Sequence, residues 1–195
     1  PFCPEVVRDK KFMGRELFEK IVRSVAPLTD EVCFHVMGEP LLHPEVDSYV
    51  AFCHTIGVRI NLTTTGFLLN QKRRDVLLNP AVKQINFSLQ SFEANFPERD
   101  NGSYLQNIFD FTERALLERP DLYINYRLWN EGAEGAPVSN DLLLKKIKQG
   151  LHVEFEKKTD LRWKKTVNLK GRVSLHFDSR FQWPHPSQPV RRDHG

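Results

Sequence analysis

Short apolar runs alternate along this chain with segments of helical periodicity, and no other feature of the sequence restricts the fold as strongly. The runs at residues 31–36, 58–62, 82–89 and 122–129 have the composition of strands that are buried on both faces. The centres of these runs are 26, 27 and 39 positions apart, at Phe34, Ile60, Phe87 and Tyr126. This spacing predicts repeated strand–helix units, and hence an α/β fold with a parallel sheet. The order of elements allows either a barrel or an open doubly wound sheet.

Segments of helical periodicity fill the intervals between these strands. They lie at residues 14–25, from Pro44 onward, and at 68–78 and 103–118. Pro44 suits a first helical position, and Pro80 and Pro120 end the last two helices, because proline has no amide hydrogen to donate.

The pattern changes after Trp129. A turn-rich connector leads to Ser139, which we expect to cap a helix that runs to about residue 149, with Gly150 just past its end. The rest is expected to hold two or three strands, among them residues 152–155 and 172–177, with a turn at Lys170-Gly171.

Composition is typical of a soluble globular protein. Hydrophobic residues make up 40% and charged residues 27%, and no apolar stretch approaches the roughly 18 residues that a membrane span needs. Three cysteines without an export signal favour a reducing cytoplasm, and we interpret Cys33 and Cys53 as buried small hydrophobic residues. Residues 151–195 carry 10 basic against 5 acidic side chains, which we interpret as a solvated surface, and we expect no nucleic-acid partner.

Polar residues follow every predicted strand, where ligands of parallel α/β folds bind. The strand ends carry one carboxylate, several hydroxyls and amides, and one guanidinium. In chain order they are Gly38, Glu39 and Pro40, then Thr63, Thr64 and Thr65, then Ser88 and Gln90, then Arg127 and Asn130. An amino-acid-like nucleoside fits this set, because a carboxylate can bind its ammonium, an arginine its carboxylate, and hydroxyls or amides its ribose.

Three segments at these strand ends resemble motifs of the radical S-adenosylmethionine enzyme family. Residues 38–44 (GEPLLHP) resemble its GGEPLLHP signature, residues 64–69 (TTGFLL) its TNG-x-LL segment, and residues 88–91 (SLQS) its S-L-D-S strand end. The departures from the family pattern, where it has Gly, Asn and Asp, are Met37, Thr65 and Gln90. The resemblance covers roughly residues 1–130, and each motif falls at the right point of the strand–helix alternation.

The resemblance implies a partial (β/α) barrel of the TIM type that lacks its first strand, in a protein that continues beyond both ends of this chain. It implies contacts with S-adenosylmethionine from Gly38, Glu39, Pro40, Thr65, Ser88, Gln90 and Arg127. It also implies a metal ligand, because Cys3 resembles the last cysteine of the C-x3-C-x2-C loop that binds a 4Fe-4S cluster in this family. Thiolates suit such clusters as soft, anionic ligands.

By the same resemblance, the activity is that of a cytoplasmic oxidoreductase. The resemblance implies that a cluster cleaves S-adenosylmethionine reductively and that the resulting 5′-deoxyadenosyl radical abstracts hydrogen from a substrate. A peptide is the first candidate for this substrate, and a flavodoxin or ferredoxin is the expected reductant. Residues 172–184 resemble the stretch before a SPASM domain. We therefore expect residues 1–150 to form the barrel core and 151–195 its last strands and a linker toward that domain. Residues 1–195 alone should be inactive, because a single cysteine cannot hold a catalytic cluster.

Two alternatives belong to other classes of protein. A non-catalytic barrel that binds a nucleotide-like ligand would use the same strand ends but would not need Cys3. A metal-dependent hydrolase would use His35 and His43, which lie near the same strand ends, although no third ligand accompanies them at a suitable spacing.

Overall fold

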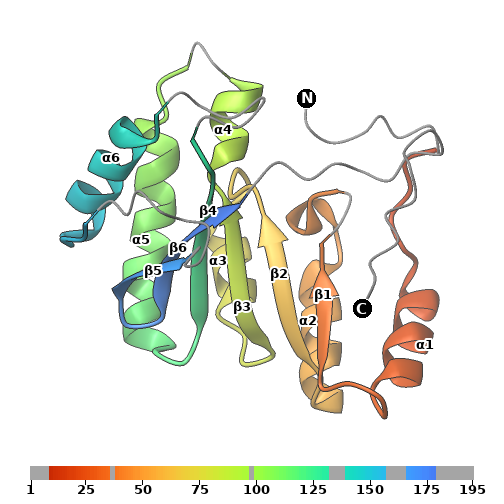
Figure 1. Cartoon of the computed structure of the whole chain (residues 1–195). Coiled ribbons are helices and arrows are strands. Elements are labelled where there is room, and N and C mark those ends of the chain that lie inside the picture. The colour runs from red at the N-terminus through yellow and green to blue at the C-terminus, as the bar shows by residue number, and fades with distance from the viewer. Residues whose placement is uncertain (1–8, 36–37, 97–98, 132–138, 157–165, 179–195) are drawn as a thin grey trace, which may run out of the picture.

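The computed structural model describes residues 9–35, 38–96, 99–131, 139–156 and 166–178 (Figure 1). Its helices are α1 (Arg15–Val25), the 3-10 turn η1 (Pro40–Leu42), α2 (Val46–Ile56), α3 (Gln71–Leu77), α4 (Gln90–Asn95), α5 (Gly102–Glu118) and α6 (Asp141–Leu151). Its strands are β1 (Glu31–Phe34), β2 (Arg59–Thr64), β3 (Val82–Ser88), β4 (Tyr123–Trp129), β5 (Thr166–Lys170) and β6 (Val173–Asp178). None of these helices has both the length and the apolarity that a membrane span requires.

The six strands form one sheet in the order β1-β2-β3-β4-β6-β5 (Figure 1). Neighbours from β1 to β6 in this order are parallel, and the helices between them serve as the crossovers that parallel pairing requires. β5 runs antiparallel to β6, because the predicted turn at Lys170-Gly171 joins the two strands as a hairpin, with Gly171 at a φ of 55°. This mixed α/β arrangement with a parallel sheet confirms the predicted fold class and agrees with a partial (β/α) barrel.

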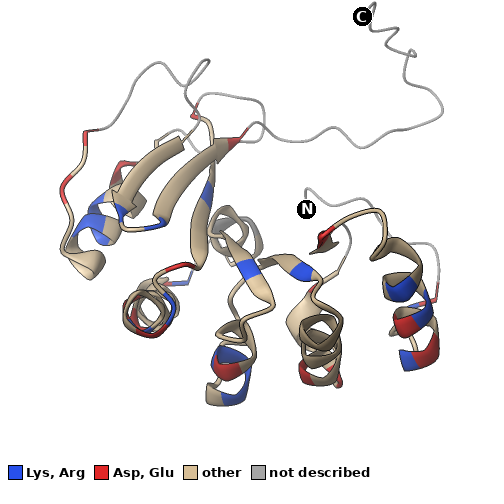
Figure 2. Cartoon of the chain, turned by 90° about the horizontal axis from the view of Figure 1, so that it is seen from below, with Lys and Arg blue, Asp and Glu red and all other residues tan. Residues whose placement is uncertain are grey.

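The two faces of the sheet differ in chemistry, because side chains alternate along each strand. One face packs against helices, and its residues are almost completely buried: Ile60, Leu62, Ile85, Phe87, Ile124, Tyr126, Leu128 and Leu175. Seen from below, the helices lie on one side of the curved row of strands (Figure 2). The opposite face, here called the polar face, carries Asn61, Thr63, Gln84, Asn86, Ser88, Asn125, Arg127, Ser174 and His176. Most of these side chains are partly exposed, so the strands are not buried on both faces as their composition suggested.

The prediction that Gly150 lies just past the end of a helix is wrong, because Gly150 lies inside α6. A Cβ atom at Gly150 would lie 2.2 Å from Cδ2 of Phe109 on α5, so this glycine permits a close approach of two helices. The helix ends instead at His152, whose φ of 52° is left-handed. At the other end the N-cap is Asn140 and not the predicted Ser139, which lies one residue earlier, although Ser139 Oγ accepts a hydrogen bond from Asp141 N–H at 3.0 Å.

Three other local features differ from the sequence predictions. Residues 152–155 are not a strand, because the backbone leaves α6 through the left-handed His152 and then runs irregularly. Helix α4 has no predicted counterpart, since six residues are too few to establish a helical period. Cys53 is completely buried as expected, but Cys33 is exposed, because it lies on β1, whose one neighbour among the described strands is β2.

Candidate functional site

The residues predicted at the strand ends lie at the carboxyl ends of β1, β2, β3 and β4, here called the rim. Gly38 and Glu39 connect β1 to η1, and Pro40 is the first residue of η1. Gly38 has a φ of 120°, which residues with a side chain rarely adopt, and nothing within 4 Å would contact a Cβ atom there. The backbone of this loop is therefore bare at Gly38, and a ligand can approach it closely.

The Glu39 carboxylate connects the loop after β1 to the end of β2. Its Oε1 atom accepts hydrogen bonds from Thr64 Oγ1 at 2.6 Å and from Leu41 N–H at 3.2 Å. Its Oε2 atom accepts from both the N–H and the hydroxyl of Thr65, each at 2.7 Å. A carboxylate has about four lone-pair sites, so Glu39 is close to its full acceptor capacity. Glu39 therefore orders the rim, and its oxygens are already engaged by donors of the protein.

Thr65 is held from its other side by Tyr104 of α5, a residue that the sequence did not single out. The Tyr104 hydroxyl donates to the Thr65 carbonyl at 2.6 Å. Burial, and after it the charge of Glu39, raises the pKa of the Tyr104 hydroxyl, which therefore stays protonated and remains a donor. No local motif marks Tyr104, because it follows Thr65 by 39 positions and reaches it only through the packing of α5 on the sheet.

Gly66 explains why the motif after β2 contains a glycine. Its φ is 79°, in the left-handed region, and its N–H donates to Thr64 Oγ1 at 3.1 Å. A Cβ atom at this position would lie 2.9 Å from Cδ1 of Ile108 and 3.3 Å from Cδ1 of Phe87. Both the backbone conformation and the close packing of α5 beneath the rim thus require glycine here.

Ser88 and Gln90 present unused polar groups at the end of β3. Ser88 is the last residue of β3, and Gln90 is the first residue of α4. The Gln90 Oε1 atom is buried and accepts no hydrogen bond from a described residue. The Ser88 hydroxyl also has no partner among the described residues, although the Ser88 carbonyl accepts from Ser91 Oγ at 2.6 Å. An unpaired buried acceptor costs about 1–3 kcal/mol, so a ligand that donates to Gln90 is favoured.

Arg127 lies beside Ser88 in the register of the sheet and forms an ion pair on the polar face. Its Nη2 atom lies 3.0 Å from Asp178 Oδ2 on β6, and the two side chains are 32% and 31% exposed. His176 Nε2 lies 3.9 Å from the same oxygen, and His176 Nδ1 lies 3.2 Å from Thr166 Oγ1. The sequence did not single out Asp178 or His176, because it does not indicate that β6 inserts between β4 and β5. A ligand carboxylate at Arg127 must share the guanidinium with Asp178 or displace it.

The structure describes His43, one of the predicted metal ligands, but not Cys3. Cys3 lies outside the described residues, and within those residues no three His, Cys, Asp or Glu side chains gather as a metal site. His43, a ligand in the hydrolase alternative, uses both ring nitrogens: Nδ1 accepts from Glu45 N–H at 3.1 Å, and Nε2 lies 3.1 Å from the Met13 carbonyl. Because Nδ1 accepts, Nε2 carries the proton and donates to Met13. His43 must therefore give up a hydrogen bond to bind zinc.

Comparison with known proteins gives a family match and several similar solved structures, two of which are structures of TYW1. The model of the Radical SAM superfamily matches residues 1–121, a range that includes the loops after β1, β2 and β3. No curated protein matches the chain. A crystal structure of archaeal TYW1 has a TM-score of 0.45 and 15% identity, and the match covers 74% of this chain and 56% of that one. A structure of TYW1 with a lysine-pyruvate adduct bound has a TM-score of 0.41 and 17% identity, covering 69% and 48%. The chain spans about half the length of these two structures.

Proposed function

Because the chain belongs to the radical SAM superfamily, we propose that it forms the S-adenosylmethionine-binding part of an enzyme that cleaves this cofactor reductively. When bound, a 4Fe-4S cluster supplies the electron that yields methionine and a 5′-deoxyadenosyl radical, which takes a hydrogen atom from the substrate. The observation that carries the proposal is the Glu39 carboxylate, which joins the loops after β1 and β2 into one ordered rim.

The first part of the rim binds the ammonium group of S-adenosylmethionine in this proposal. Gly38 and Pro40 present the bare backbone of the loop, and the negative charge of Glu39 lies where the ammonium group binds. Glu39 acts mainly by positioning, because its four hydrogen bonds hold Thr65 and the loop in place. Thr65 contributes through its hydroxyl, which the same bonds orient.

The second part of the rim binds the ribose and the carboxylate. Gln90 Oε1 accepts from a ribose hydroxyl, which relieves its unpaired state, and the neighbouring Ser88 hydroxyl binds the second one. Arg127 binds the carboxylate with the guanidinium N–H groups that its contact with Asp178 leaves unused. These assignments give Gln90 Oε1 and the Ser88 hydroxyl partners on the cofactor.

The wider organisation of the enzyme follows the family resemblance. We propose residues 1–150 as the barrel core, residues 151–195 as its last strands and a linker to a SPASM-type domain, and Cys3 as a cluster ligand. A peptide is the proposed substrate, and a flavodoxin or ferredoxin the proposed reductant of this cytoplasmic oxidoreductase. Residues 1–195 alone should form no 5′-deoxyadenosine, because the remaining cluster cysteines are proposed to lie outside this range.

The test is anaerobic reconstitution of the complete enzyme with iron and sulfide, followed by reduction and measurement of the 5′-deoxyadenosine formed from S-adenosylmethionine. Cys3→Ala should lose both the cluster absorbance and the nucleoside. Cys33→Ala is the matched control, because it removes an exposed thiol of β1 and should keep both. Gln90→Leu should keep the cluster and weaken S-adenosylmethionine binding about fivefold, the effect of about one lost hydrogen bond.

Two results would contradict the proposal. If the enzyme held an intact cluster and bound S-adenosylmethionine without cleaving it, the non-catalytic binding barrel would be the better description. If Cys3→Ala kept the cluster and formed the nucleoside at the wild-type rate, Cys3 would not be a cluster ligand.

A further inference from the structure

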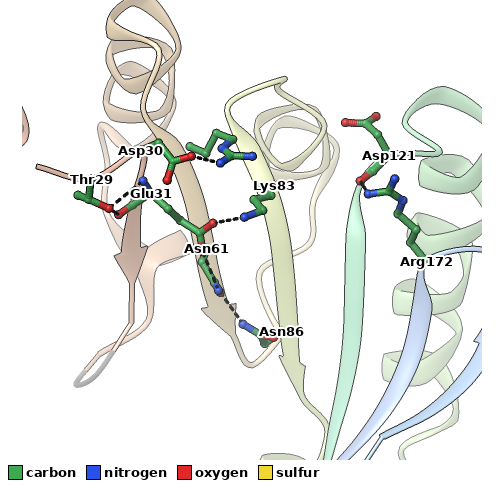
Figure 3. A network of polar contacts seen from close by, with 9 residues as sticks. Thr29, Asp30, Glu31, Asn61, Lys83, Asn86, Asp121 and Arg172 are labelled. Carbon is green, nitrogen blue, oxygen red and sulfur yellow. Dashed lines mark hydrogen bonds and ion pairs between the residues drawn. The ribbon is translucent and has the colours of Figure 1, made fainter. Parts of the chain in front are cut away.

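A row of side-chain hydrogen bonds crosses the polar face from β4 to β1, below the rim. Asn125 Nδ2 donates to Asn86 Oδ1 at 3.0 Å, and Asn86 Nδ2 donates to Asn61 Oδ1 at 2.8 Å. Asn61 Nδ2 then donates to Glu31 Oε1 at 3.3 Å, and Lys83 Nζ binds Glu31 Oε2 at 2.5 Å. Figure 3 shows the part of this row that lies on β1, β2 and β3. Four strands are thus joined through side chains as well as through the backbone.

The hydrogen bonds of the row all run from donor to acceptor toward Glu31, because the row ends on a carboxylate. The hydrogen bond from Lys83 lowers the pKa of Glu31 against the opposing effect of burial, and the bond from Asn61 lowers it further. Glu31 is therefore ionised at neutral pH and can only accept. Asn61 must turn its NH2 group toward Glu31 and its oxygen toward Asn86. Asn86 is held in the matching orientation by two further bonds, because its Nδ2 donates to the Leu62 carbonyl at 3.3 Å and its Oδ1 accepts from Gln84 Nε2 at 2.9 Å. Asn125 must then turn its NH2 group toward Asn86 and its oxygen away from it.

The free end of the row presents an acceptor to the middle of the polar face. Asn125 Oδ1 accepts no hydrogen bond from a described residue. The hydroxyl of Ser174, which lies beside Asn125 on β6, also has no partner among the described residues. Neighbouring strands lie about 4.8 Å apart, so the two groups are adjacent. Asn125 and Ser174 lie two residues, or about 7 Å, farther from the rim than Ser88, Arg127 and His176. An acceptor and a hydroxyl donor thus lie side by side directly beneath the rim.

The ionised groups that border this position are paired with one another. Glu31 binds Lys83, and Arg127 binds Asp178, toward which His176 also turns. A charged ligand group would lose its hydration here and would have to share or displace one of these ion pairs of the described residues. The interior of a (β/α) barrel is usually filled by Val, Ile and Leu, so packing alone does not explain amides at these positions. The chemistry of this face therefore matches a neutral ligand that forms hydrogen bonds.

We propose that Asn125 and Ser174 bind a neutral amide group of the substrate. Asn125 Oδ1 accepts the N–H of that group, and the Ser174 hydroxyl donates to its carbonyl. The inference rests on the proposed function for the position of the cofactor above this row, and it selects peptide or carboxamide substrates. A fatty acyl chain would leave the Asn125 acceptor unpaired, and a phosphate group would have to compete with Glu31 for Lys83 or with Asp178 for Arg127.

Binding can be tested without cofactor, by NMR of the 195-residue chain with N-methylacetamide as the probe. We expect saturable shifts of the Asn125 side-chain amide signals and of the Ser174 backbone amide signal. Sodium acetate and methylammonium chloride at the same concentrations should leave these signals unchanged. Asn125→Leu keeps the approximate size of the side chain and removes both polar atoms, so it should abolish the saturable shift at Ser174.

Glu31→Gln and Ser174→Ala test which groups hold the probe. A glutamine at position 31 no longer requires Asn61 to donate, but the Leu62 carbonyl still requires the NH2 group of Asn86, so Asn125 should keep its oxygen turned to the probe. We therefore expect Glu31→Gln to leave the dissociation constant for N-methylacetamide unchanged. Ser174→Ala removes the proposed donor to the probe carbonyl and should raise the constant about fivefold, the effect of about one lost hydrogen bond. Asp30→Asn is the matched control for Glu31→Gln, because Asp30 pairs with Arg59 outside the row, and it should leave the constant unchanged.

Three results would overturn the inference: no saturable shift in the wild-type chain, equal shifts with acetate or methylammonium, or wild-type affinity in Ser174→Ala. The titration needs neither cluster nor S-adenosylmethionine, so it separates this inference from the proposed function. Nucleoside formation without probe binding would contradict the amide site alone. Probe binding without nucleoside formation by an enzyme with an intact cluster would contradict the radical chemistry alone.

Discussion

Replacing Tyr104 with phenylalanine removes one hydroxyl from beneath the rim and leaves the ring contacts in place. The hydroxyl donates to the Thr65 carbonyl at 2.6 Å, whereas the ring centroid lies 4.9 Å from that of Phe67 and 4.8 Å from that of Phe92. A buried hydrogen bond contributes about 1 kcal/mol, and leaving its acceptor partly unpaired costs about as much again. We expect Tyr104→Phe to lower the free energy of unfolding by about 1–2 kcal/mol in urea denaturation.

Tyr126→Phe is the matched control, because it removes the same group from a contact of α5 with the core. The Tyr126 hydroxyl lies 2.7 Å from Thr112 Oγ1, and both residues are completely buried. Thr112 already donates its hydroxyl proton to the Ile108 carbonyl at 2.9 Å, so Tyr126 is the donor in this pair. Both variants lose one buried tyrosine donor, and we expect similar losses of stability.

The two variants should differ at the rim. Without the Tyr104 hydroxyl, Thr65 is held by Glu39 alone, so the amide hydrogens of Thr65 and Gly66 should exchange about tenfold faster. The dissociation constant for S-adenosylmethionine in the reconstituted enzyme should rise by a similar factor, and Tyr126→Phe should change neither quantity. If both variants changed exchange and affinity alike, the cause would be a general loss of stability, and Tyr104 would have no positioning role.

Three further predictions concern glycine and cysteine positions. Gly66→Ala should lower the free energy of unfolding by about 3 kcal/mol, and Gly57→Ala should lower it by about 1 kcal/mol. Both glycines have a positive φ, but only Gly66 is packed against other side chains. Equal losses in urea denaturation would refute this steric argument. Burial raises the pKa of Cys53 from 9.0 to about 11, so the folded state keeps a proton that the unfolded state releases, and stability should hold below pH 9 and fall by about 2 kcal/mol toward pH 11. Urea denaturation across this range should show a shallower fall in Cys53→Ala, and an equally steep one would exclude Cys53 as a cause. At pH 8, iodoacetamide should modify Cys33 in the folded chain and Cys53 only on unfolding, as peptide mass spectrometry can measure.

The framework could be predicted because its elements have strong periods and clear ends. Strand β3 was expected at residues 82–89 and spans Val82–Ser88, and α5 was expected at 103–118 and spans Gly102–Glu118. Helix α3 begins three residues later than predicted, because the Asn70 side chain accepts from Arg73 N–H at 3.0 Å and caps it there. A capping residue inside an apolar segment thus moved the boundary without changing the type of element.

The contacts at the rim could be predicted only in part. The sequence identified the residues at the ends of the strands, and the contact of Glu39 with a ligand stays a prediction, but the sequence did not indicate that four protein donors hold the oxygens of Glu39. Three of those donors belong to Thr64 and Thr65, which reach Glu39 only because β1 and β2 are adjacent. The partner of Arg127, Asp178, depends in the same way on the insertion of β6 beside β4. Both contacts are properties of strand order, which periodicity does not determine.

A repeated dipeptide links the core of this sheet to its polar face. The pair Ile-Asn occurs once in each of β2, β3 and β4, and the three isoleucines, Ile60, Ile85 and Ile124, are at most 1% exposed among the helices. Because side chains alternate, each following asparagine must point to the opposite face, where valine would favour the strand more. An isolated amide there would cost stability, but these amides satisfy one another through the row that ends on Glu31. Asn86 has further partners, since its Nδ2 donates to the Leu62 carbonyl at 3.3 Å and its Oδ1 accepts from Gln84 Nε2 at 2.9 Å, so it does not depend on Asn125. Asn125 therefore adds little to the stability of the row. Its Oδ1, which accepts from no described residue, is the physical reason to expect that it serves a ligand on the polar face.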